Sequence, residues 1–380
     1  METALLWIGI ALAGVLGVIG VYWIYLRLML TEAPRASRIF QVPTADGWTI
    51  RVCRYTNPEN PGPPVILCHG IMANQFSLTA PEGDSLVDVL VERGFDCWVM
   101  DARGTRSSTA PPGKSRYDAR ASDYALQDMP ALIDFVRSTT GYEKVHWAGH
   151  SMGGLMLYMY LAAYGSDSIA SGTTIGSPPG FNHFKPERIG WLVFLVGLAP
   201  VVMEFLWRCN SVLFKVFRVN SRMVPINWDN MDPRVGAATF FNMVELLPHP
   251  AVMELQACVE TRQWKIRNGE IDVNANLSKM DAPLLLVFGN ADLFTPLEPS
   301  RALYDSLPKG RKRLLILGRD HNCLHDYSHV DLVFSPRGRT EVYEPIAAWM
   351  EALRIKKGTP KLHPMPHAHA PEPSHTEKPA

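Results

Sequence analysis

Cysteine is sparse in this chain, and an excess of either charge is missing. The six cysteines form no C-x-x-C pair, and several lie in apolar runs such as "VILCHG" and "FDCWVMD", where a thiol acts as a small core residue. The sequence therefore suggests neither a disulfide scaffold nor a zinc site, and a reducing compartment is favoured. The formal net charge of +0 gives no electrostatic basis for nucleic acid as a partner. No motif points to a metal, nucleotide or flavin cofactor, so we expect none.

Charge is also missing from Thr3 to Leu26, "TALLWIGIALAGVLGVIGVYWIYL". As a helix, this stretch is long enough to cross a hydrocarbon core of ~30 Å. Tyrosine and tryptophan lie near its ends, as interfacial aromatic residues do. A cleaved signal peptide would have a basic beginning and a shorter apolar core, whereas only Glu2 precedes the apolar residues here. The sequence therefore predicts a single-pass transmembrane anchor over residues 1–30.

The orientation of this anchor follows from the basic residues beside it. Arg27, Arg35 and Arg38 lie on its C-terminal side, and no Lys or Arg precedes the apolar stretch. By the positive-inside rule, we expect the main domain to face the cytoplasm.

Beyond the anchor, short apolar strands alternate with amphipathic helices. The chain has 380 residues, 47% of them hydrophobic, which suffices for one large domain with an insertion. The predicted strands "PVILCHG", "FDCWVMD" and "KVHWAG" are each followed by a segment with helical spacing. Such alternation predicts an α/β fold with a mostly parallel sheet flanked by helices.

The alternation stops near Pro178 and resumes at "APLLLVFGNADLFTP". The intervening residues have a largely helical pattern and are unusually apolar. Their run "WLVFLVGLAPVVMEFLW" is short for a second transmembrane span and fits a buried or membrane-dipping helix. We expect five segments: an anchor at 1–30, a first part of the core at 31–180, a helical cap or lid insertion at 181–270, a second part of the core at 271–356, and a disordered Pro- and His-rich tail at 357–380.

A serine between glycines follows the third of these strands. The residues "GHSMGG" place Ser151 where a buried strand runs straight into a helix. In that context a G-x-S-x-G pattern predicts a nucleophile elbow, a tight turn that lifts the hydroxyl clear of the sheet at a helix N-terminus. The alternative is a glycine-rich turn with a structural serine, which the flanking strand and helix disfavour. We expect Ser151 to be a nucleophile.

A serine nucleophile needs a histidine to take its proton and a carboxylate to orient that histidine. Asp292 directly follows the apolar strand "LLLVFG", whereas Asp281 precedes that strand and falls at the wrong end of the sheet. After the next strand, "GRDHNCLHDYSHVDLVFS" offers His321, His325 and His329 as bases. Their spacing of four could instead indicate a metal-binding helix face, but the intervening residues fit a loop better. The acid is therefore expected at Asp292 and the base at one of these histidines.

The oxyanion of a tetrahedral intermediate needs two backbone N–H donors. Met152 directly follows the predicted nucleophile at a helix N-terminus, and we expect it to supply one. Ile71, in the loop after "VILCHG", is expected to supply the other. His69 and Gly70 shape that loop, and the strand-end position of His69 favours a structural role over that of a base.

Together these residues resemble the α/β-hydrolase superfamily, and within it the acid-lipase and lipase-like branch. The resemblance covers about Ile39 to Ala352 and is carried by "CHGIMANQFS", "LVERGFDCWVMDARGTRSS", "DMPALIDFVRSTTGYEKVHWAGHSMGG", "FGNADLFTP" and "SHVDLVFSPRGRTEVYEPI". Lipases of this branch have a His-Gly loop, a strand that ends in an Arg-Gly pair, a serine elbow, and a base in a His-x-Asp motif before a final Tyr-containing helix. The resemblance implies Ser151, Asp292 and His329 as a catalytic triad.

The resemblance thus separates the candidate bases. The stretch "HVDLVFS" and its distance to Val342 and Tyr343 fit the lipase pattern, which favours His329. His321 lies nearer the strand end, where most hydrolases of the superfamily carry their base, and is the fallback. If His329 is the base, the loop after the strand "RLLILG" is longer than usual.

The stretch "DARGTRSS" departs from the lipase branch, in which a neutral residue is usual where this chain has Asp101. Other hydrolases carry an aspartate there as a structural partner of the following arginine. We therefore expect Asp101 and Arg103 to form a pair that holds the loop.

The resemblance implies a serine hydrolase that cleaves carboxylic esters through an acyl-enzyme, and the apolar N-terminal stretch predicts that it is membrane-anchored. The anchor and the apolar insertion favour a lipophilic ester or acyl substrate. Two alternatives remain: an acyltransferase with the same triad, and a catalytically idle hydrolase fold that serves as a membrane scaffold. A scaffold would be marked by a broken triad, whereas every part is present here.

Overall fold

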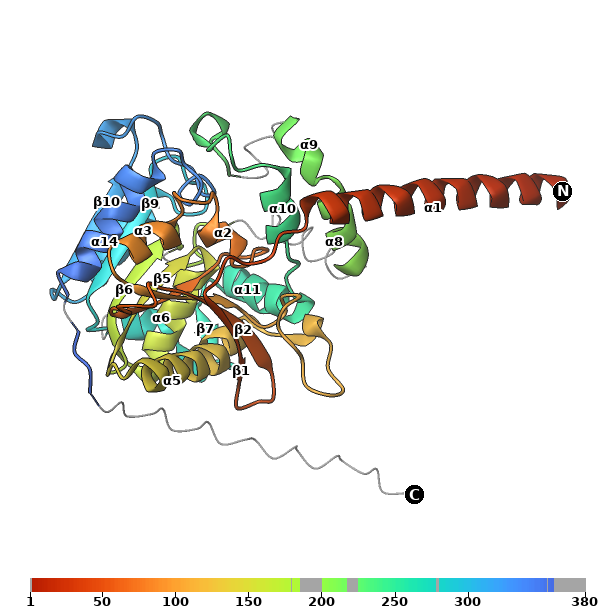
Figure 1. The fold of residues 1–380 in the computed structure, drawn as a ribbon. Coiled ribbons are helices and arrows are strands. Elements are labelled where there is room, and N and C mark those ends of the chain that lie inside the picture. The colour runs from red at the N-terminus through yellow and green to blue at the C-terminus, as the bar shows by residue number, and fades with distance from the viewer. Residues whose placement is uncertain are drawn as a thin grey trace, which may run out of the picture.

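The computed structural model describes residues 2–178, 180–184, 200–216, 225–277, 280–353 and 355–358. An eight-stranded sheet forms the centre of the fold, in the order β1-β2-β4-β3-β5-β6-β9-β10 (Figure 1). Strands β3, β4, β5, β6, β9 and β10 run parallel to one another. Strand β1 pairs antiparallel with β2, and β2 pairs antiparallel with β4. The bounds are β1 (Arg38–Pro43), β2 (Thr49–Tyr55), β3 (Pro64–Cys68), β4 (Asp96–Asp101), β5 (Val145–His150), β6 (Ile169–Ile175), β9 (Leu284–Gly289) and β10 (Lys312–Leu317), and a separate hairpin pairs β7 (Lys265–Ile266) with β8 (Ile271–Asp272).

Helices cover both faces of the sheet. Strands β3, β4 and β5 are buried along their whole length, as expected for strands with helices on either side. The helices are α1 (Glu2–Leu30), α2 (Phe76–Thr79), α3 (Leu86–Glu92), α4 (Ala121–Asp123), α5 (Met129–Thr140), α6 (Met152–Tyr164), α8 (Pro200–Cys209), α9 (Ser211–Val216), α10 (Ala237–Met243), α11 (His249–Thr261), α12 (Val273–Asn276), α13 (Leu297–Ser306) and α14 (Glu344–Glu351).

Alternate residues of each strand belong to two apolar cores, one on each face of the sheet. Ile66 and Trp98 belong to a core shared with α5, α6 and α13, whereas Leu67 and Val99 belong to a core shared with α3 and α14. This alternation follows from the pleat, which directs successive side chains to opposite faces. The parallel sheet with helices on both sides confirms the predicted fold class. Strand β6 has no counterpart among the predicted strands, because "IASGTTI" lacks a continuous apolar run.

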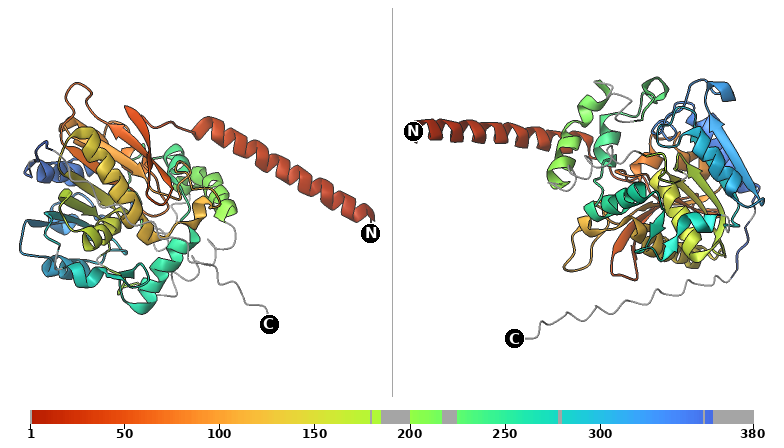
Figure 2. Two further views of the ribbon diagram at one scale, coloured as in Figure 1. Left: turned by 90° about the horizontal axis from the view of Figure 1, so that it is seen from below. Right: turned by 180° about the vertical axis from the view of Figure 1, so that it is seen from behind.

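The helix α1 projects from the rest of the molecule (Figures 1 and 2). An 18-residue window within Thr3–Leu30 has a mean hydropathy of 2.5 and is 0% buried. By length and composition α1 is a candidate membrane span, and a signal sequence near an N-terminus would share these properties.

The C-terminal end of α1 packs against helices α8 and α10. The Trp23 ring lies 4.8 Å from the ring of Phe205 and 5.7 Å from that of Phe241, measured between centroids. The Tyr22 hydroxyl donates a hydrogen bond to the carbonyl of Cys209 (3.0 Å). Figures 1 and 2 show α8, α9 and α10 gathered around this end of α1.

Asn242, in α10, joins the end of α1 to the loop after β3. Its amide donates to the carbonyl of Leu30 (2.6 Å), and its amide oxygen accepts from the N–H of Glu32 (3.2 Å). Its carbonyl accepts from the side-chain amide of Asn74 (2.8 Å). Three parts of the chain that are distant in sequence therefore meet at one residue.

Part of the predicted segmentation lies outside the described residues, namely 185–199 and 217–224 of the cap and 359–380 of the tail. The described stretches of the predicted cap contain α8 to α11, and the helical insertion and its bounds stay a prediction. Lys357 and Gly358 do not continue as a free tail, because Lys357 forms a β-bridge with Tyr142 and the Gly358 N–H bonds to Gly141.

Candidate active site

Ser151 lies between β5 and α6, at the carboxyl edge of the parallel strands. Its backbone has φ 52° and ψ −113°, a conformation that an L-residue adopts only when the surrounding structure imposes it. Its N–H is held by the carbonyl of Ile175 at the end of β6 (2.8 Å). The turn therefore has the strained geometry expected of a nucleophile elbow.

The glycines around Ser151 are required by close backbone packing. A Cβ at Gly149 would lie 2.2 Å from the carbonyl carbon of Gly153. A Cβ at Gly153 would lie 2.4 Å from the carbonyl oxygen of Cys68 in β3, and one at Gly154 would lie 2.0 Å from the hydroxyl of Ser177. Each of these contacts is shorter than atoms tolerate, so the pattern around Ser151 reflects the crossing of α6 over β3 and β6.

The structure brings Ser151, His329 and Asp292 together. The Ser151 hydroxyl lies 2.8 Å from His329 Nε2, and His329 Nδ1 lies 2.8 Å from Asp292 Oδ2. All three side chains are buried. They come from the turn after β5, the loop after β10 and the loop after β9, which meet at one edge of the sheet. The geometry is that of a serine hydroxyl, a base and a carboxylate that orients the base.

Asp292 is held as an anion by the groups around it. The Thr295 hydroxyl donates to its Oδ2 (2.6 Å), and the N–H of Phe294 donates to its Oδ1 (2.8 Å). Burial raises the pKa of Asp292, but the imidazole of His329 and these two donors outweigh burial and hold the pKa below its ordinary value. The carboxylate is therefore available to orient His329 at neutral pH.

Gly176, directly after β6, leaves room for this pair. It has φ +56°, and a Cβ there would lie 3.2 Å from His329 Nδ1, 3.3 Å from Asp292 Oδ2 and 2.8 Å from a methyl group of Leu332. Neither Gly176 nor Thr295 emerged from the sequence patterns. The Thr295 position carries a local signal, because a hydroxyl three residues after an aspartate closes a turn, whereas Gly176 has no such signal.

The loop that carries His329 is fixed by a buried aspartate. Asp331 accepts hydrogen bonds from the N–H of Asn227 (3.0 Å), the side chain of Asn230 (3.0 Å) and the N–H of Ser328 (3.0 Å). The Asp of the His-x-Asp motif therefore ties the loop after β10 to the segment that precedes α10.

The other candidate histidines lie elsewhere. His321 is exposed and lies in a single helical turn, Arg319–His321, directly after β10, and His325 is half-buried in the following loop. The residues after His321 do not continue this turn, so the spacing of four does not place the three histidines on one helix face. Among the described residues, no group of three or more His, Cys, Asp or Glu side chains is arranged to hold a metal ion.

His150 is a further buried histidine beside His329, with ring centroids 4.9 Å apart. Its Nε2 bonds to the backbone carbonyl of His329 (3.1 Å). Burial, and then the neighbouring imidazole of His329, lower the pKa of His150 to about 3. A neutral His150 therefore supports the backbone of His329 at ordinary pH.

The loop after β3 borders Ser151, as the oxyanion expectation requires. Cys68 pairs with Gly149 across β3 and β5, and a Cβ at Gly70 would lie 3.2 Å from the Ser151 Cβ. Met152 is the first residue of α6, so its N–H is one of the helix donors without an intrahelical acceptor. Ile71 follows Gly70 in this loop, and its role as the second donor stays a prediction.

His69 has a structural environment. Its Nδ1 bonds to the carbonyl of Gly70 (2.8 Å), and its Nε2 accepts the N–H of Ala102 (3.2 Å). Both ring nitrogens are thereby engaged in holding the loops after β3 and β4, and burial lowers the pKa of His69.

The predicted pair between Asp101 and Arg103 is wrong. Asp101 binds Arg51 (2.6 Å) and accepts the N–H of Gln75 (2.8 Å). Arg103 binds Asp128 (2.7 Å) and also pairs with Asp46 in the β1–β2 turn. Both residues hold loops near the site, but their partners lie in different elements. Asp101 pairs with β2 and the loop after β3, whereas Arg103 pairs with the β1–β2 turn and the end of the helical segment before α5.

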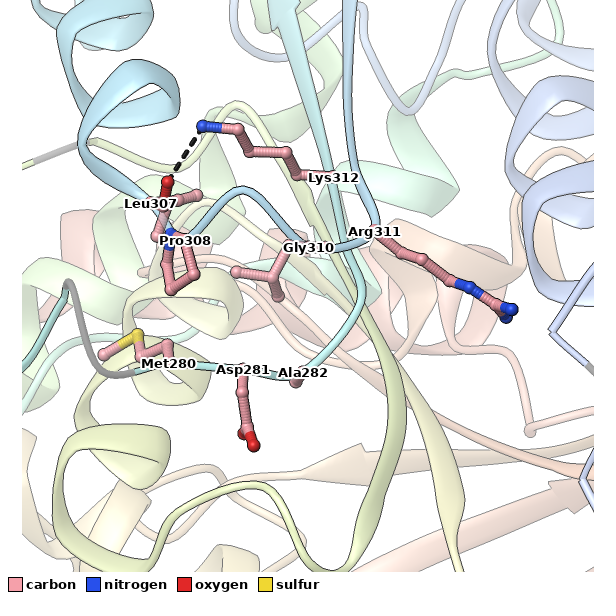
Figure 3. A pocket seen from close by; sticks show the side chains of 9 residues that line it. Met280, Asp281, Ala282, Leu307, Pro308, Gly310, Arg311 and Lys312 are labelled. Carbon is pink, nitrogen blue, oxygen red and sulfur yellow. Dashed lines mark hydrogen bonds between the residues drawn. The ribbon is translucent and has the colours of Figure 1, made fainter.

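A small cavity of about 10 Å³ lies at the opposite edge of the sheet, between the chain leading into β9 and the chain leading into β10 (Figure 3). Its lining includes Asp281, Gly310 and Lys312, and the Lys312 ammonium donates to the carbonyl of Leu307 (2.9 Å). Room for about one water molecule is too little for an organic substrate. Asp281 is thus separated from Ser151 by the length of the strands, as its sequence position predicts.

Comparison with known proteins agrees with this architecture. Residues 63–197 match the alpha/beta hydrolase fold family. The chain is 33% identical to mouse gastric triacylglycerol lipase over 137 residues (33% of this chain, 35% of the lipase). It is 31% identical to the lysosomal acid lipase/cholesteryl ester hydrolase of Macaca fascicularis over 203 residues (50% of this chain, 44% of that protein). The aligned stretches therefore span less than half the length of either lipase.

Among solved structures, a thermophilic esterase from Thermogutta terrifontis matches with a TM-score of 0.55 and 19% identity, covering 83% of this chain and 99% of the esterase. Identity at this level bears on the fold alone. Fold and sequence together show an α/β-hydrolase fold, and part of the chain resembles the acid lipases.

Proposed function

We propose that this chain is a membrane-anchored serine hydrolase that cleaves lipophilic carboxylic esters. The observation that carries the proposal is the pair of 2.8 Å contacts that link Ser151 to His329 and His329 to Asp292 on a strained strand-to-helix turn. The similarity to triacylglycerol and cholesteryl ester lipases supports an ester as the substrate class.

In the proposed acylation step, Ser151 Oγ attacks the ester carbonyl carbon while His329 Nε2 takes the hydroxyl proton. Asp292 stabilises the imidazolium that forms, and its contact with Nδ1 keeps Nε2 free to act as a base. The N–H groups of Met152 and Ile71 receive the negative charge that develops on the carbonyl oxygen. His329 then donates the proton to the leaving alcohol, and an acyl-enzyme on Ser151 remains.

In the proposed deacylation step, water takes the position of the leaving alcohol. His329 Nε2 removes a proton from this water, which attacks the acyl carbon, and the proton then passes to Ser151 Oγ as the carboxylic acid leaves. The serine is regenerated without any change of oxidation state, so hydrolysis consumes only ester and water.

A lipophilic substrate is supported by two features of the fold. The apolar surface of α1 exceeds what a soluble domain exposes, which favours a bilayer as its surroundings. Helices α8 and α10 of the cap pack on the end of α1, so the cap stands at the side of the molecule from which membrane lipids would approach.

The test is covalent labelling of the detergent-solubilised full chain with a lipophilic fluorophosphonate. We expect wild type and the matched control His321→Ala to label, Ser151→Ala not to label, and His329→Ala to label at least about 100-fold more slowly. Circular dichroism and thermal unfolding would establish that each variant is folded.

Other outcomes separate the competing functions. Absence of labelling in folded wild type would overturn the serine hydrolase and favour the idle scaffold. Loss of labelling in His321→Ala rather than His329→Ala would move the base to His321. Labelling followed by transfer of the acyl group to an added alcohol, with no free acid released, would instead assign an acyltransferase.

A further inference from the structure

Helix α8 has the reverse of the usual amphipathic arrangement. Its two charged side chains, Glu204 and Arg208, are only 6% and 7% exposed, whereas Val201, Val202 and Leu206 are 65%, 53% and 45% exposed. In a soluble domain the charged residues of a helix face water and the apolar ones face the core. The outward face of α8 is therefore suited to apolar rather than aqueous surroundings.

The two buried charges of α8 are held in different ways, Glu204 by arginines of the domain and Arg208 against an aromatic ring. Glu204 accepts a hydrogen bond from Arg116 (2.6 Å) and lies 3.5 Å from Arg106. The Arg208 guanidinium lies 5.1 Å from the ring centre of Phe241 in α10. These contacts hold the charged side of α8 against the rest of the chain. The opposite, apolar side of the helix therefore faces outward.

The next helix also exposes apolar side chains. In α9, Ser211 is buried while Val212 and Leu213 are 41% and 40% exposed. We define the α8–α9 face as the exposed apolar side chains of these two helices. Its members are Val201, Val202, Leu206, Val212 and Leu213.

The position of α8 along α1 fixes the depth of this face. A helix rises ~1.5 Å per residue, so the stretch from Thr3 to Tyr22 is ~30 Å long, which equals the thickness of a hydrocarbon core. Tyr22 and Trp23 contact Cys209 and Phe205 of α8. When residues 3–22 span the core, α8 therefore lies at the boundary between acyl chains and headgroups, where Tyr and Trp are also favoured.

We propose that the α8–α9 face docks into the same bilayer that α1 crosses. The proposal rests on the membrane anchor of the proposed function, and it commits to lipid as the occupant because the face adjoins α1 at the depth of the membrane surface. The cap is then a monotopic surface element, with apolar side chains among the acyl chains and its charged pairs turned toward the domain.

Docking would link the membrane surface to the loop beside Ser151. Glu245 contacts both Arg106 (3.0 Å) and Arg116 (3.4 Å), the two arginines beside Glu204, and its N–H bonds to the carbonyl of Met72 (3.1 Å) in the loop after β3. The membrane-facing helix thus connects, through paired charges, to the loop that borders Ser151.

The experiment measures the depth of single fluorophores on the full chain in nanodiscs. An environment-sensitive dye is attached at Val202→Cys, at Leu16→Cys in α1, or at Leu324→Cys. Leu324 matches Val202 in exposure (55% against 53%) but lies in the loop after β10, a strand on the other side of the molecule from α1 (Figure 1). The half-buried thiols of Cys209 and Cys323 are replaced by Ser, and the remaining four native thiols are buried. Lipids with a quencher at a shallow or a deep acyl position then report depth.

We expect the shallow quencher to remove about half of the emission from the dye at position 202, the deep quencher to act on position 16, and neither to affect position 324. Quenching at 16 without quenching at 202 would overturn docking and leave the anchor intact. Absence of quenching at both positions would overturn docking and anchor together. Quenching at 202 alone would uphold docking and overturn the transmembrane span.

A second variant links docking to turnover. Leu206→Gln and Met253→Gln change apolar side chains of equal exposure, 45% each, but Met253 lies on α11, outside the α8–α9 face. We expect Leu206→Gln to lower hydrolysis of an ester dissolved in vesicles about tenfold while hydrolysis of a water-soluble short-chain ester is unchanged. Equal rates for both variants on vesicle-borne ester would contradict the role of the face in substrate access.

Discussion

Gly176 approaches the His329 imidazole so closely that a Cβ in its place would lie 3.2 Å from Nδ1, the nitrogen that bonds Asp292. We predict that Gly176→Ala lowers kcat at least about tenfold, because the added methyl group displaces the histidine from its position between Ser151 and Asp292. The measurement is steady-state hydrolysis of a soluble short-chain ester.

The matched control for this variant is Gly94→Ala. Gly94 has φ +84° but nothing within 4 Å of its hypothetical Cβ, so it bears backbone strain without crowding. Gly94→Ala should lose about 1–2 kcal/mol of unfolding free energy through backbone strain and Gly176→Ala at least as much, whereas only Gly176→Ala should lose activity. Similar rates for the two variants would show that the close approach has no catalytic consequence.

Asp292 and Thr295 should differ in how much catalysis they support. Asp292→Asn keeps the shape but removes the anion, and we expect kcat to fall by about 10³–10⁴. Thr295→Val removes only the 2.6 Å donor to Asp292 and should cost about tenfold, while Thr295→Ser should retain the rate of wild type. A Thr295→Val enzyme as slow as Asp292→Asn would mean that the hydroxyl does more than hold the carboxylate.

His150 should make the fold sensitive to acid. Its pKa is lowered to about 3 by burial, so between pH 3 and pH 6.5 the unfolded chain binds a proton at this position that the folded chain does not. Above about pH 6.5, His150 therefore costs the folded state no stability. Below that pH, the unfolding free energy falls with decreasing pH, by up to about 1.4 kcal/mol per pH unit.

The measurement is urea unfolding of the full chain in detergent between pH 4 and pH 7. His150→Gln should reduce the slope of unfolding free energy against pH by about one proton. Buried His146 and His69, whose pKa values are also lowered by burial, should preserve part of the slope in this variant. Identical slopes in wild type and His150→Gln would show that His150 does not titrate differently on folding.

The two tryptophans of α1 should contribute differently to the stability of the domain. Trp23 contacts Phe205 and Phe241, whereas Trp7 is 68% exposed near the other end of the helix. Trp23→Ala should lower the unfolding free energy by about 2 kcal/mol, and Trp7→Ala should leave it unchanged. Thermal unfolding in one detergent measures both, and equal midpoints would mean that the domain folds independently of α1.

Much of the fold could be predicted because several of its strands are largely apolar. Strands β3, β4 and β5 emerge from "VILC", "DCWVMD" and "KVHWAG", whereas β6 does not, because its Ser, Gly and Thr residues depend on neighbouring strands for burial. The elbow at Ser151 is likewise local, since a strand, a turn and a helix follow one another within a few residues.

The remaining features depend on contacts that are distant in sequence. His321 and His329 both follow β10, and only the folded loop distinguishes the exposed ring from the one that contacts Ser151. Arg103 pairs with Asp128 and Asp46, whereas its neighbour Asp101 pairs with Arg51. Pairing by sequence proximity therefore fails where partners are supplied by other elements.

The junction at Asn242 has a kinetic consequence. The Asn242 side chain bonds Leu30 and Glu32, and its backbone carbonyl bonds Asn74. The end of α1 is therefore fixed to the loop beside Ser151 and not joined to it by a flexible linker. With α1 in a bilayer, Ser151 is held at one height, and the proposed hydrolase meets esters by diffusion in two dimensions. Turnover should then follow the mole fraction of ester in the membrane and be insensitive to dilution of the vesicle suspension.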